Sequence, residues 1–178
     1  MTDTPLTPGR LWKSLTLAER LTVARTFWLD EQATDDQIQA VMLIAQQKKF
    51  RPKTVIGLDI ERKAHHLASL PNLSDALAAR ALIVYHLAER RPMMGAFLDA
   101  LGIAHENGLI QEDEVKPDAA KLASAAAMIG EQFPAAEVAL YLNTLLSQDP
   151  ATWGGLSDVV KGLGDRGQGS DSGLGIGG

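Results

Sequence analysis

The stretch Ala88–Leu101, AERRPMMGAFLDAL, places a proline between two apolar helical runs with almost no loop between them. Proline disfavours helix in the residue before it and is tolerated in the first turn of a helix. Pro92 therefore predicts a sharp corner at which one helix ends and the next begins. The same arrangement surrounds Pro52 in KKFRPKTVIGLDI (48–60) and Pro134 in GEQFPAAEVALYL (130–142).

The three corner prolines are 40 and 42 residues apart, and the rest of the chain carries no run of alternating β-branched residues. These features predict an all-α protein of seven to eight helices. A period of about 40 residues is in the range of HEAT- and armadillo-type helical repeats. Two architectures follow: a short repeat-like stack of helix-Pro-helix pairs, or a compact irregular bundle.

Capping motifs mark several predicted helix starts. Thr16-Leu-Ala-Glu19 is a capping box, in which Thr and Glu side chains each bind a free backbone amide, and Thr34-Asp-Asp-Gln37 has the same form. Apolar residues at helical spacing then predict the buried faces. In the helix after Thr34 they are Ile38, Val41, Met42 and Ala45, and in a helix after Pro52 they are Ile56, Ile60, Ala64 and Leu67.

Length and composition predict one helical domain, residues 1–163, followed by a flexible tail, residues 164–178, that reads GDRGQGSDSGLGIGG. Glycine loses more entropy than any other residue when it is ordered, and little in this tail could be buried. The 178 residues include no cysteine, which excludes disulfides and thiolate chemistry. No apolar run reaches the roughly 20 residues of a membrane span. We expect a soluble, cytoplasmic protein without a cofactor.

Charge is divided unevenly along the chain. Residues 1–91 hold 13 Lys/Arg against 10 Asp/Glu, a net charge of +3, whereas residues 92–178 hold 4 against 12, a net charge of −8. Six cations cluster at two of the corners and are the predicted partner-binding residues: Lys48, Lys49, Arg51, Lys53, Arg90 and Arg91. Such a strip would bind acidic groups. The alternative is that these cations only complement helix dipoles at helix ends.

The longest predicted loop, residues 102–116, contains a second candidate site. Within LGIAHENGLIQEDE (101–114), His105 and Glu106 are candidate acid–base residues if the protein is an enzyme. Glu112, Asp113 and Glu114 are a weaker candidate for holding a divalent cation through water. A calcium-loop alignment fails because Ile103 occupies the first ligand position. Asn107-Gly108 is a strong turn dipeptide, so the alternative is a polar turn without a site.

The remaining histidines predict no metal site. His65 and His66 are expected on the solvent side of their helix, and His86 on the polar stripe of its own, so all three are expected at the surface. The sequence contains none of the short motifs of nucleotide-binding loops, serine hydrolases or zinc proteases. No catalytic function is therefore predicted by motif.

Together these features favour a non-catalytic helical protein-interaction module, which binds a protein partner or a second copy of itself. The alternative is a small helical enzyme or ligand-binding protein with a pocket at the 102–116 loop. A second alternative is weak nucleic-acid contact through the basic corners. A sequence pI near 5.3 argues against nucleic acid, because dedicated binders are usually strongly basic.

Overall fold

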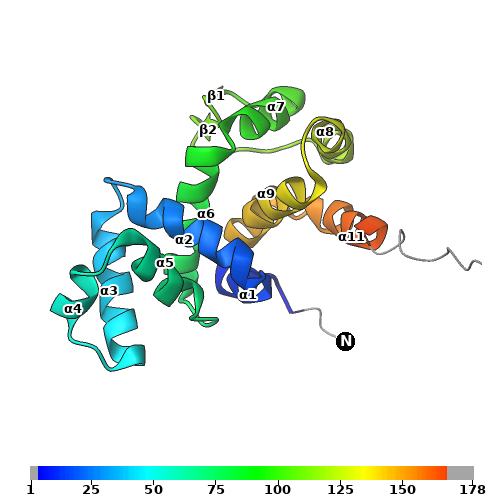
Figure 1. Cartoon of the computed structure of the whole chain (residues 1–178). Coiled ribbons are helices and arrows are strands. Elements are labelled where there is room, and N and C mark those ends of the chain that lie inside the picture. Colours follow the sequence, from blue (N-terminus) through cyan, green and yellow to red (C-terminus); the bar gives the residue numbers. More distant parts are fainter. Residues whose placement is uncertain (1–3, 168–178) are drawn as a thin grey trace, which may run out of the picture. The chain divides into compact units, whose positions relative to one another are not determined.

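The computed structural model describes residues 4–167. Within that range the chain forms eleven helices and one two-stranded hairpin, so the prediction of an all-α protein is confirmed (Figure 1). The predicted flexible tail, residues 164–178, lies outside the described residues except for the backbone of 164–167, which continues the last helix. The chain divides into two compact units, Met1–Arg91 and Pro92–Gly178. The single domain over residues 1–163 stays a prediction.

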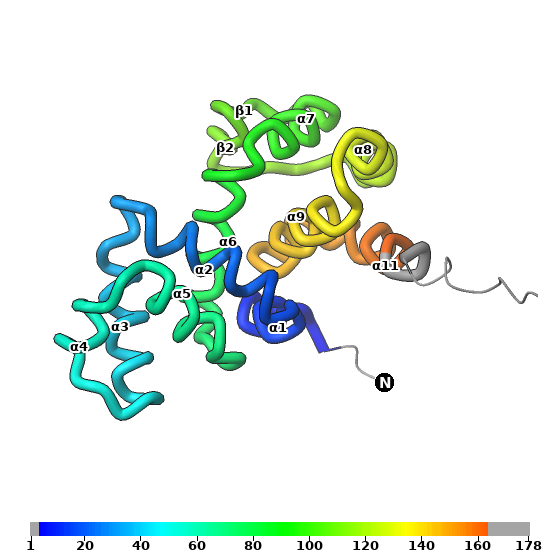
Figure 2. Tube along the Cα trace, in the orientation of Figure 1, coloured from blue at the N-terminus to red at the C-terminus, as the bar shows by residue number. Residues whose placement is uncertain are grey.

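The first unit packs its helices around a buried core to which α6 contributes more buried side chains than any other helix. Trp12, Phe27 and Leu82 are completely buried, and the indole Nε1 of Trp12 donates a hydrogen bond of 2.8 Å to the carbonyl of Leu70. Figure 2 shows α2 beside α5 in this unit. The helices are α1 (Pro8–Ser14), α2 (Leu17–Leu29), α3 (Thr34–Lys48), α4 (Pro52–Ile56), α5 (Ile60–Ala68) and α6 (Asp75–Glu89).

One of the two predicted capping boxes is confirmed and the other is wrong. Thr16 accepts from the amide of Glu19, whose carboxylate accepts from the amide of Thr16 at 2.7 Å, and α2 begins there. Thr34 is already the first residue of α3 and makes no capping hydrogen bond. Gln37 instead donates its side-chain amide to the carbonyls of Phe27 and Asp30 at 2.9 and 2.7 Å, so it caps the end of α2. The free carbonyls at the end of α2 compete successfully for this amide group.

The predicted buried faces of two helices are wrong in part. Val41 and Ala45 are buried as expected, but the side chains of Ile38 and Met42 are 55% and 54% exposed. The predicted continuous helix after Pro52 is broken into α4 and α5, because Asp59 accepts from the amide of Arg62 and starts a new helix. The break leaves Ile56 60% exposed.

The second unit packs its helices around aromatic side chains. The ring of Phe97 lies 5.7 Å from that of Tyr141 and 6.1 Å from that of Trp153. A Cβ on Gly155 would stand 2.7 Å from a methyl of Leu122, so the turn between α10 and α11 passes close to α8 at this glycine. The elements are α7 (Arg91–Leu101), β1 (His105–Glu106), β2 (Leu109–Ile110), α8 (Ala119–Gln132), α9 (Ala135–Gln148), α10 (Pro150–Trp153) and α11 (Leu156–Gly167).

Each of the three corner prolines lies at the start of a helix. Pro52 is the first residue of α4, Pro92 the second residue of α7, and Pro134 the residue immediately before α9. The predicted local geometry of the helix-Pro-helix corners is therefore confirmed. The final predicted helix, expected from residue 149 or 150 to about residue 163, is divided into α10 and α11.

Candidate functional site

The turn between α3 and α4 holds four of the six predicted partner-binding cations, Lys48, Lys49, Arg51 and Lys53, which we call the basic corner. Helix α3 ends when Lys49 adopts the left-handed conformation, with φ of 58°. The amide of Phe50 then binds the carbonyl of Ala45 at 3.0 Å. A residue with a Cβ costs about 1–2 kcal/mol in this conformation, so the sharp turn is held at some expense.

The chain leaves this turn under the control of Pro52. Arg51 is extended, as the residue before a proline usually is, and α4 begins at once. The side chain of Val55 is completely buried and fixes α4 to the first unit. All four cations of the basic corner are exposed on the turn.

No compensating charge lies close to the basic corner in the sequence. Residues 37–58 contain no Asp or Glu. Among the described residues, the side chains of the four cations form neither a hydrogen bond nor an ion pair. The basic corner is therefore a local concentration of unpaired positive charge, although the chain as a whole has a net charge of −5.

Exposed apolar side chains accompany these cations. Phe50 is 39% exposed and Ile56 is 60% exposed. The ring of Phe50 makes a near-perpendicular contact with the ring of His66, with centroids 5.4 Å apart. Partial burial, together with the charge of Lys48 and the neighbouring His65, lowers the pKa of His66. Nearer the start of α3, the apolar side chains of Met42 and Ile38 are also exposed.

The other two predicted partner-binding residues lie elsewhere in the first unit. Helices α3 and α6 run in opposite directions (Figure 1), and Arg80 of α6 contacts Asp36 in the first turn of α3 at 3.1 Å. Arg91 lines a small cleft of about 400 Å³ with Leu29 at the end of α2, which precedes α3. The basic corner lies at the far end of α3, a helix of 15 residues. The structure therefore does not bring the two sets together.

The side chains of Arg90 and Arg91 also fold back onto α6. The guanidinium of Arg90 donates to the hydroxyl of Tyr85 at 3.0 Å and lies 5.5 Å from the centre of its ring. Arg91 donates from Nε to the carbonyl of Leu87 at 2.7 Å. Both contacts fit the alternative role given above, in which cations cover the carbonyl end of a helix.

The loop with His105 and Glu106 forms the hairpin β1–β2. Gly102, with φ of 71°, ends α7, and the amide of Ile103 binds the carbonyl of Leu98 at 3.0 Å. Asn107 and Gly108 have φ of 51° and 87° and connect the two strands. Two positive φ angles define the type I′ turn that Asn-Gly favours. The predicted turn at this dipeptide is confirmed.

Both ring nitrogens of His105 are engaged within this part of the second unit. The amide of Gly108 donates to Nδ1 at 3.0 Å, so the proton resides on Nε2, which donates to the carboxylate of Asp99 at 2.7 Å. A Cβ on Gly95 would lie 3.3 Å from the ring, so the absence of a side chain there lets the imidazole approach α7. To act as a base, His105 would have to release the amide of Gly108. Glu106 lies exposed beside it.

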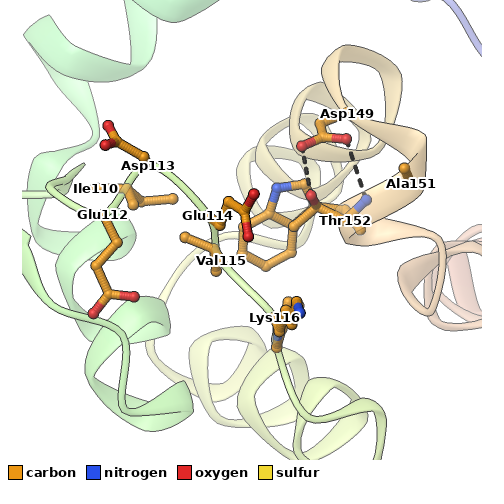
Figure 3. Close-up of a pocket in the computed structure, with 11 residues that line it drawn as sticks. Ile110, Glu112, Asp113, Glu114, Val115, Lys116, Asp149, Ala151 and Thr152 are labelled. Atoms are coloured by element: carbon orange, nitrogen blue, oxygen red, sulfur yellow. Dashed lines mark hydrogen bonds between the residues drawn. The ribbon is translucent and has the colours of Figure 1, made fainter.

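An open cleft of about 800 Å³ lies between the segment 110–117 and α10, in the second unit (Figure 3). In this view Glu114 points toward the α10 side, whereas the carboxylates of Glu112 and Asp113 point away from it. Asp149 accepts from the hydroxyl and the amide of Thr152, and these hydrogen bonds lower the pKa of Asp149. Residues 4–167 contain no group of three acidic or histidine side chains able to hold a metal ion.

Sequence reasoning missed two features of the candidate sites, one in each unit. Asp99, the partner of His105, lies six residues upstream on α7, and no spacing rule connects a helix residue with a hairpin residue. Ile38 and Ile56 were assigned to the core because they are apolar at helical spacing, although both are exposed, and Ile56 lies on α4 beside the basic corner. An unusually long stretch without acidic residues, 37–58, was the available signal for this surface.

Comparison of the chain with protein-family models, with curated protein sequences and with solved structures finds no match. In the part of the chain that the structure describes, no helix combines the length and the apolar character needed to cross a membrane.

Proposed function

We propose that the protein is a non-catalytic interaction module that binds an acidic segment of a protein at the basic corner. The observation that supports this most directly is the combination of four exposed, unpaired cations with exposed Phe50 and Ile56 within residues 48–56. Aromatic residues, Met and Arg are enriched at protein interfaces. An exposed apolar patch bordered by polar residues typically marks an interaction site.

The two kinds of side chain have separate roles in this recognition. The cations attract an acidic segment and increase the association rate, because unpaired charges act over roughly a Debye length, about 10 Å at 0.1 M salt. Phe50 and Ile56 supply apolar area that is buried on contact. Met42 extends this area along α3, and its flexible side chain adapts to different partner surfaces. A segment with acidic and apolar residues at helical spacing fits both requirements.

The test is the binding of a defined peptide by fluorescence anisotropy. The probe is a fluorescein-labelled peptide of Glu residues with Leu at every third or fourth position. Lys48→Glu combined with Lys53→Glu should weaken its binding by at least about tenfold, because opposite charges that steer and hold the peptide become like charges. Ile56→Ser should weaken it further, since apolar area is lost.

A matched pair elsewhere on the chain controls for net charge. Lys13 lies in the last turn of α1, as Lys48 does in α3, and Lys121 lies near the start of α8, as Lys53 does in α4. Lys13→Glu combined with Lys121→Glu should weaken binding by less than about threefold. Equal losses in the two pairs would overturn the proposal. So would equal competition by a single-stranded DNA of the same charge, since bare electrostatics would then explain binding.

A second candidate function has its own observation, the open cleft beside the segment 110–117. In this alternative the protein binds a small organic cation, with Glu114 and Asp149 as its counter-charges. Isothermal titration with spermidine would then give saturable heat that Glu114→Gln weakens and Lys48→Glu leaves unchanged. Heat that does not saturate would remove this alternative. An enzymatic role for His105 and Glu106 at the same loop would require substrate turnover that His105→Gln abolishes.

The architecture proposed from the proline spacing also stays open to test. A repeat-like stack requires the corners at Pro52, Pro92 and Pro134 to follow one another along a common edge. Distances between spin labels on the first and second units would measure that arrangement. The interaction proposal does not depend on it, because the basic corner lies entirely within the first unit.

A further inference from the structure

We infer that the acidic segment bound at the basic corner is supplied by a second copy of this chain, through residues 109–118. This inference rests on the proposed function and names its partner. The sequence of the segment is LIQEDEVKPD, in which Glu112, Asp113 and Glu114 are consecutive. It has the composition that the basic corner requires, acidic residues next to apolar ones.

The segment is as unpaired as the basic corner. Glu112, Asp113 and Glu114 are exposed, and their carboxylates form neither a hydrogen bond nor an ion pair with any described residue. The side chain of Leu109, at the start of the segment, is 48% exposed. Glu112 and Asp113 are among the residues that line the cleft beside α10, and in Figure 3 their carboxylates point away from α10.

The backbone amides and carbonyls of the segment are also available for hydrogen bonds to a partner. Among the described backbone hydrogen bonds, the only one made by an amide of residues 111–117 joins Gln111 to the carbonyl of Ala104 at 3.3 Å. The amides and carbonyls from Glu112 to Lys116 are therefore not committed to a helix or a strand. An extended, acidic segment of this kind can align its side chains with a cationic turn.

Charge complementarity supports a second copy over an unrelated partner. The four cations of the basic corner belong to the half of the chain with a net charge of +3, and the segment belongs to the half with a net charge of −8. Two copies can therefore contact one another through unlike halves. Each chain has one basic corner and one segment, so association of two copies brings unlike surfaces together.

Sedimentation velocity of the full-length chain tests the inference. At about 50 mM salt the wild type should associate, and at about 500 mM salt it should dissociate, because screening shortens the reach of exposed charges. Two variants should each be monomeric at low salt. The corner variant carries Lys48→Glu and Lys53→Glu, and the segment variant carries Glu112→Lys and Asp113→Lys.

The decisive sample is an equal mixture of these two variants, which should associate again. The native segment of the corner variant meets the native basic corner of the segment variant, and the two altered surfaces are also complementary. Each reversal changes the charge by two, so the variants have net charges of −9 and −1 and no overall attraction. Recovery in the mixture would therefore report the specific contact. The Lys13→Glu, Lys121→Glu control should associate like the wild type.

The outcomes separate this inference from the proposed function. A wild-type chain that stays monomeric at low salt up to about 500 µM would overturn the inference. A mixture that stays monomeric would overturn it too. In either case the Glu–Leu peptide still tests the basic corner independently. If the chain associates but the peptide binds equally well to the corner variant, the proposed site is wrong and the association arises elsewhere.

Discussion

At the scale of single residues, two tryptophans of the first unit have different surroundings for the same indole group. Trp12 is completely buried and donates its Nε1 proton to the carbonyl of Leu70. Trp28 is 7% exposed, and its buried Nε1 has no hydrogen-bond partner among the described residues. A buried polar group that loses its partner costs more than one that never had a partner.

We therefore expect Trp12→Phe to lower the free energy of unfolding by about 1–3 kcal/mol more than Trp28→Phe. Both changes shorten the ring system, but only the first leaves the Leu70 carbonyl unsatisfied. Phenylalanine at position 28 removes an unsatisfied donor and keeps an aromatic face for Lys63, whose Nζ lies 5.6 Å from the Trp28 ring. Urea denaturation followed by circular dichroism measures both values. Equal losses would contradict this account of the hydrogen bond.

The burial of His86 makes the stability of the folded chain depend on pH. It was expected at the surface, but its side chain is only 2% exposed, so this expectation is wrong. Its helix, α6, is central to the first unit, and even the polar stripe of that helix is covered at His86. Burial, and then the charge of Arg90, lower the pKa of His86 from its usual value of 6.5 to about 3.

Between pH 6.5 and 3 the unfolded chain therefore binds a proton at residue 86 that the folded chain does not. Stability is complete above pH 6.5 and decreases as the pH falls through that value. From pH 7.5 to pH 5 the wild type should lose about 2 kcal/mol more unfolding free energy than His86→Gln, which cannot titrate. Urea titrations of both chains at the two pH values measure this. The same pH dependence in both would show that His86 is protonated while folded.

At the scale of elements, the hairpin β1–β2 shows that a cluster of polar residues can serve structure rather than chemistry. His105 joins its own turn, through Gly108, to α7, through Asp99. The ring is largely buried, since its side chain is 15% exposed, whereas the Asp99 side chain is 76% exposed. The interaction holds the hairpin against α7. The second strand of this hairpin, β2, is also the start of the segment 109–118.

If this role is correct, His105→Ala should lower the unfolding free energy by about 1–2 kcal/mol, because two hydrogen bonds are lost. Asp99→Asn is the matched control, since the amide oxygen still accepts from Nε2, and it should cost less than about 0.5 kcal/mol. Thermal and urea unfolding measure both. No loss of stability in His105→Ala would contradict a structural role for this residue.

At the scale of the whole molecule, backbone hydrogen bonding predicts where the chain opens. Helices α2 and α6 contact one another and are long helices with buried side chains, including Phe27 and Leu82, and their amides are bonded along the helices. The segment 111–117 has almost no backbone hydrogen bonds among the described residues. Regions with few buried contacts and exposed amides open at low free energy.

Hydrogen exchange followed by mass spectrometry should therefore show the slowest exchange in α2 and α6 and the fastest internal exchange in residues 111–117. At 50 mM salt and high protein concentration, self-association should slow exchange in that segment and around residues 48–56 together. At about 500 mM salt the protection of both should disappear, because the charges are screened. Protection that appears in only one of the two regions would contradict a contact between them.

The local features of this protein could be predicted because they depend on residues close in sequence. The capping box at Thr16, the helix starts at the corner prolines and the Asn107-Gly108 turn each involve groups at most a few residues apart. The backbone preferences of proline and glycine and the spacing of helix caps act at that range. The all-α class follows from their repetition along the chain.

The exposed faces and the site depended on tertiary structure. An amphipathic pattern shows which residues share a face, but not whether another helix covers it, so Ile38 and Ile56 were wrongly assigned to the core and His86 to the surface. The separation of Arg90 and Arg91 from the basic corner follows from the opposite directions of α3 and α6, which no local signal encodes. Burial depends on elements that lie far apart in the chain, and only the folded arrangement determines which of them meet.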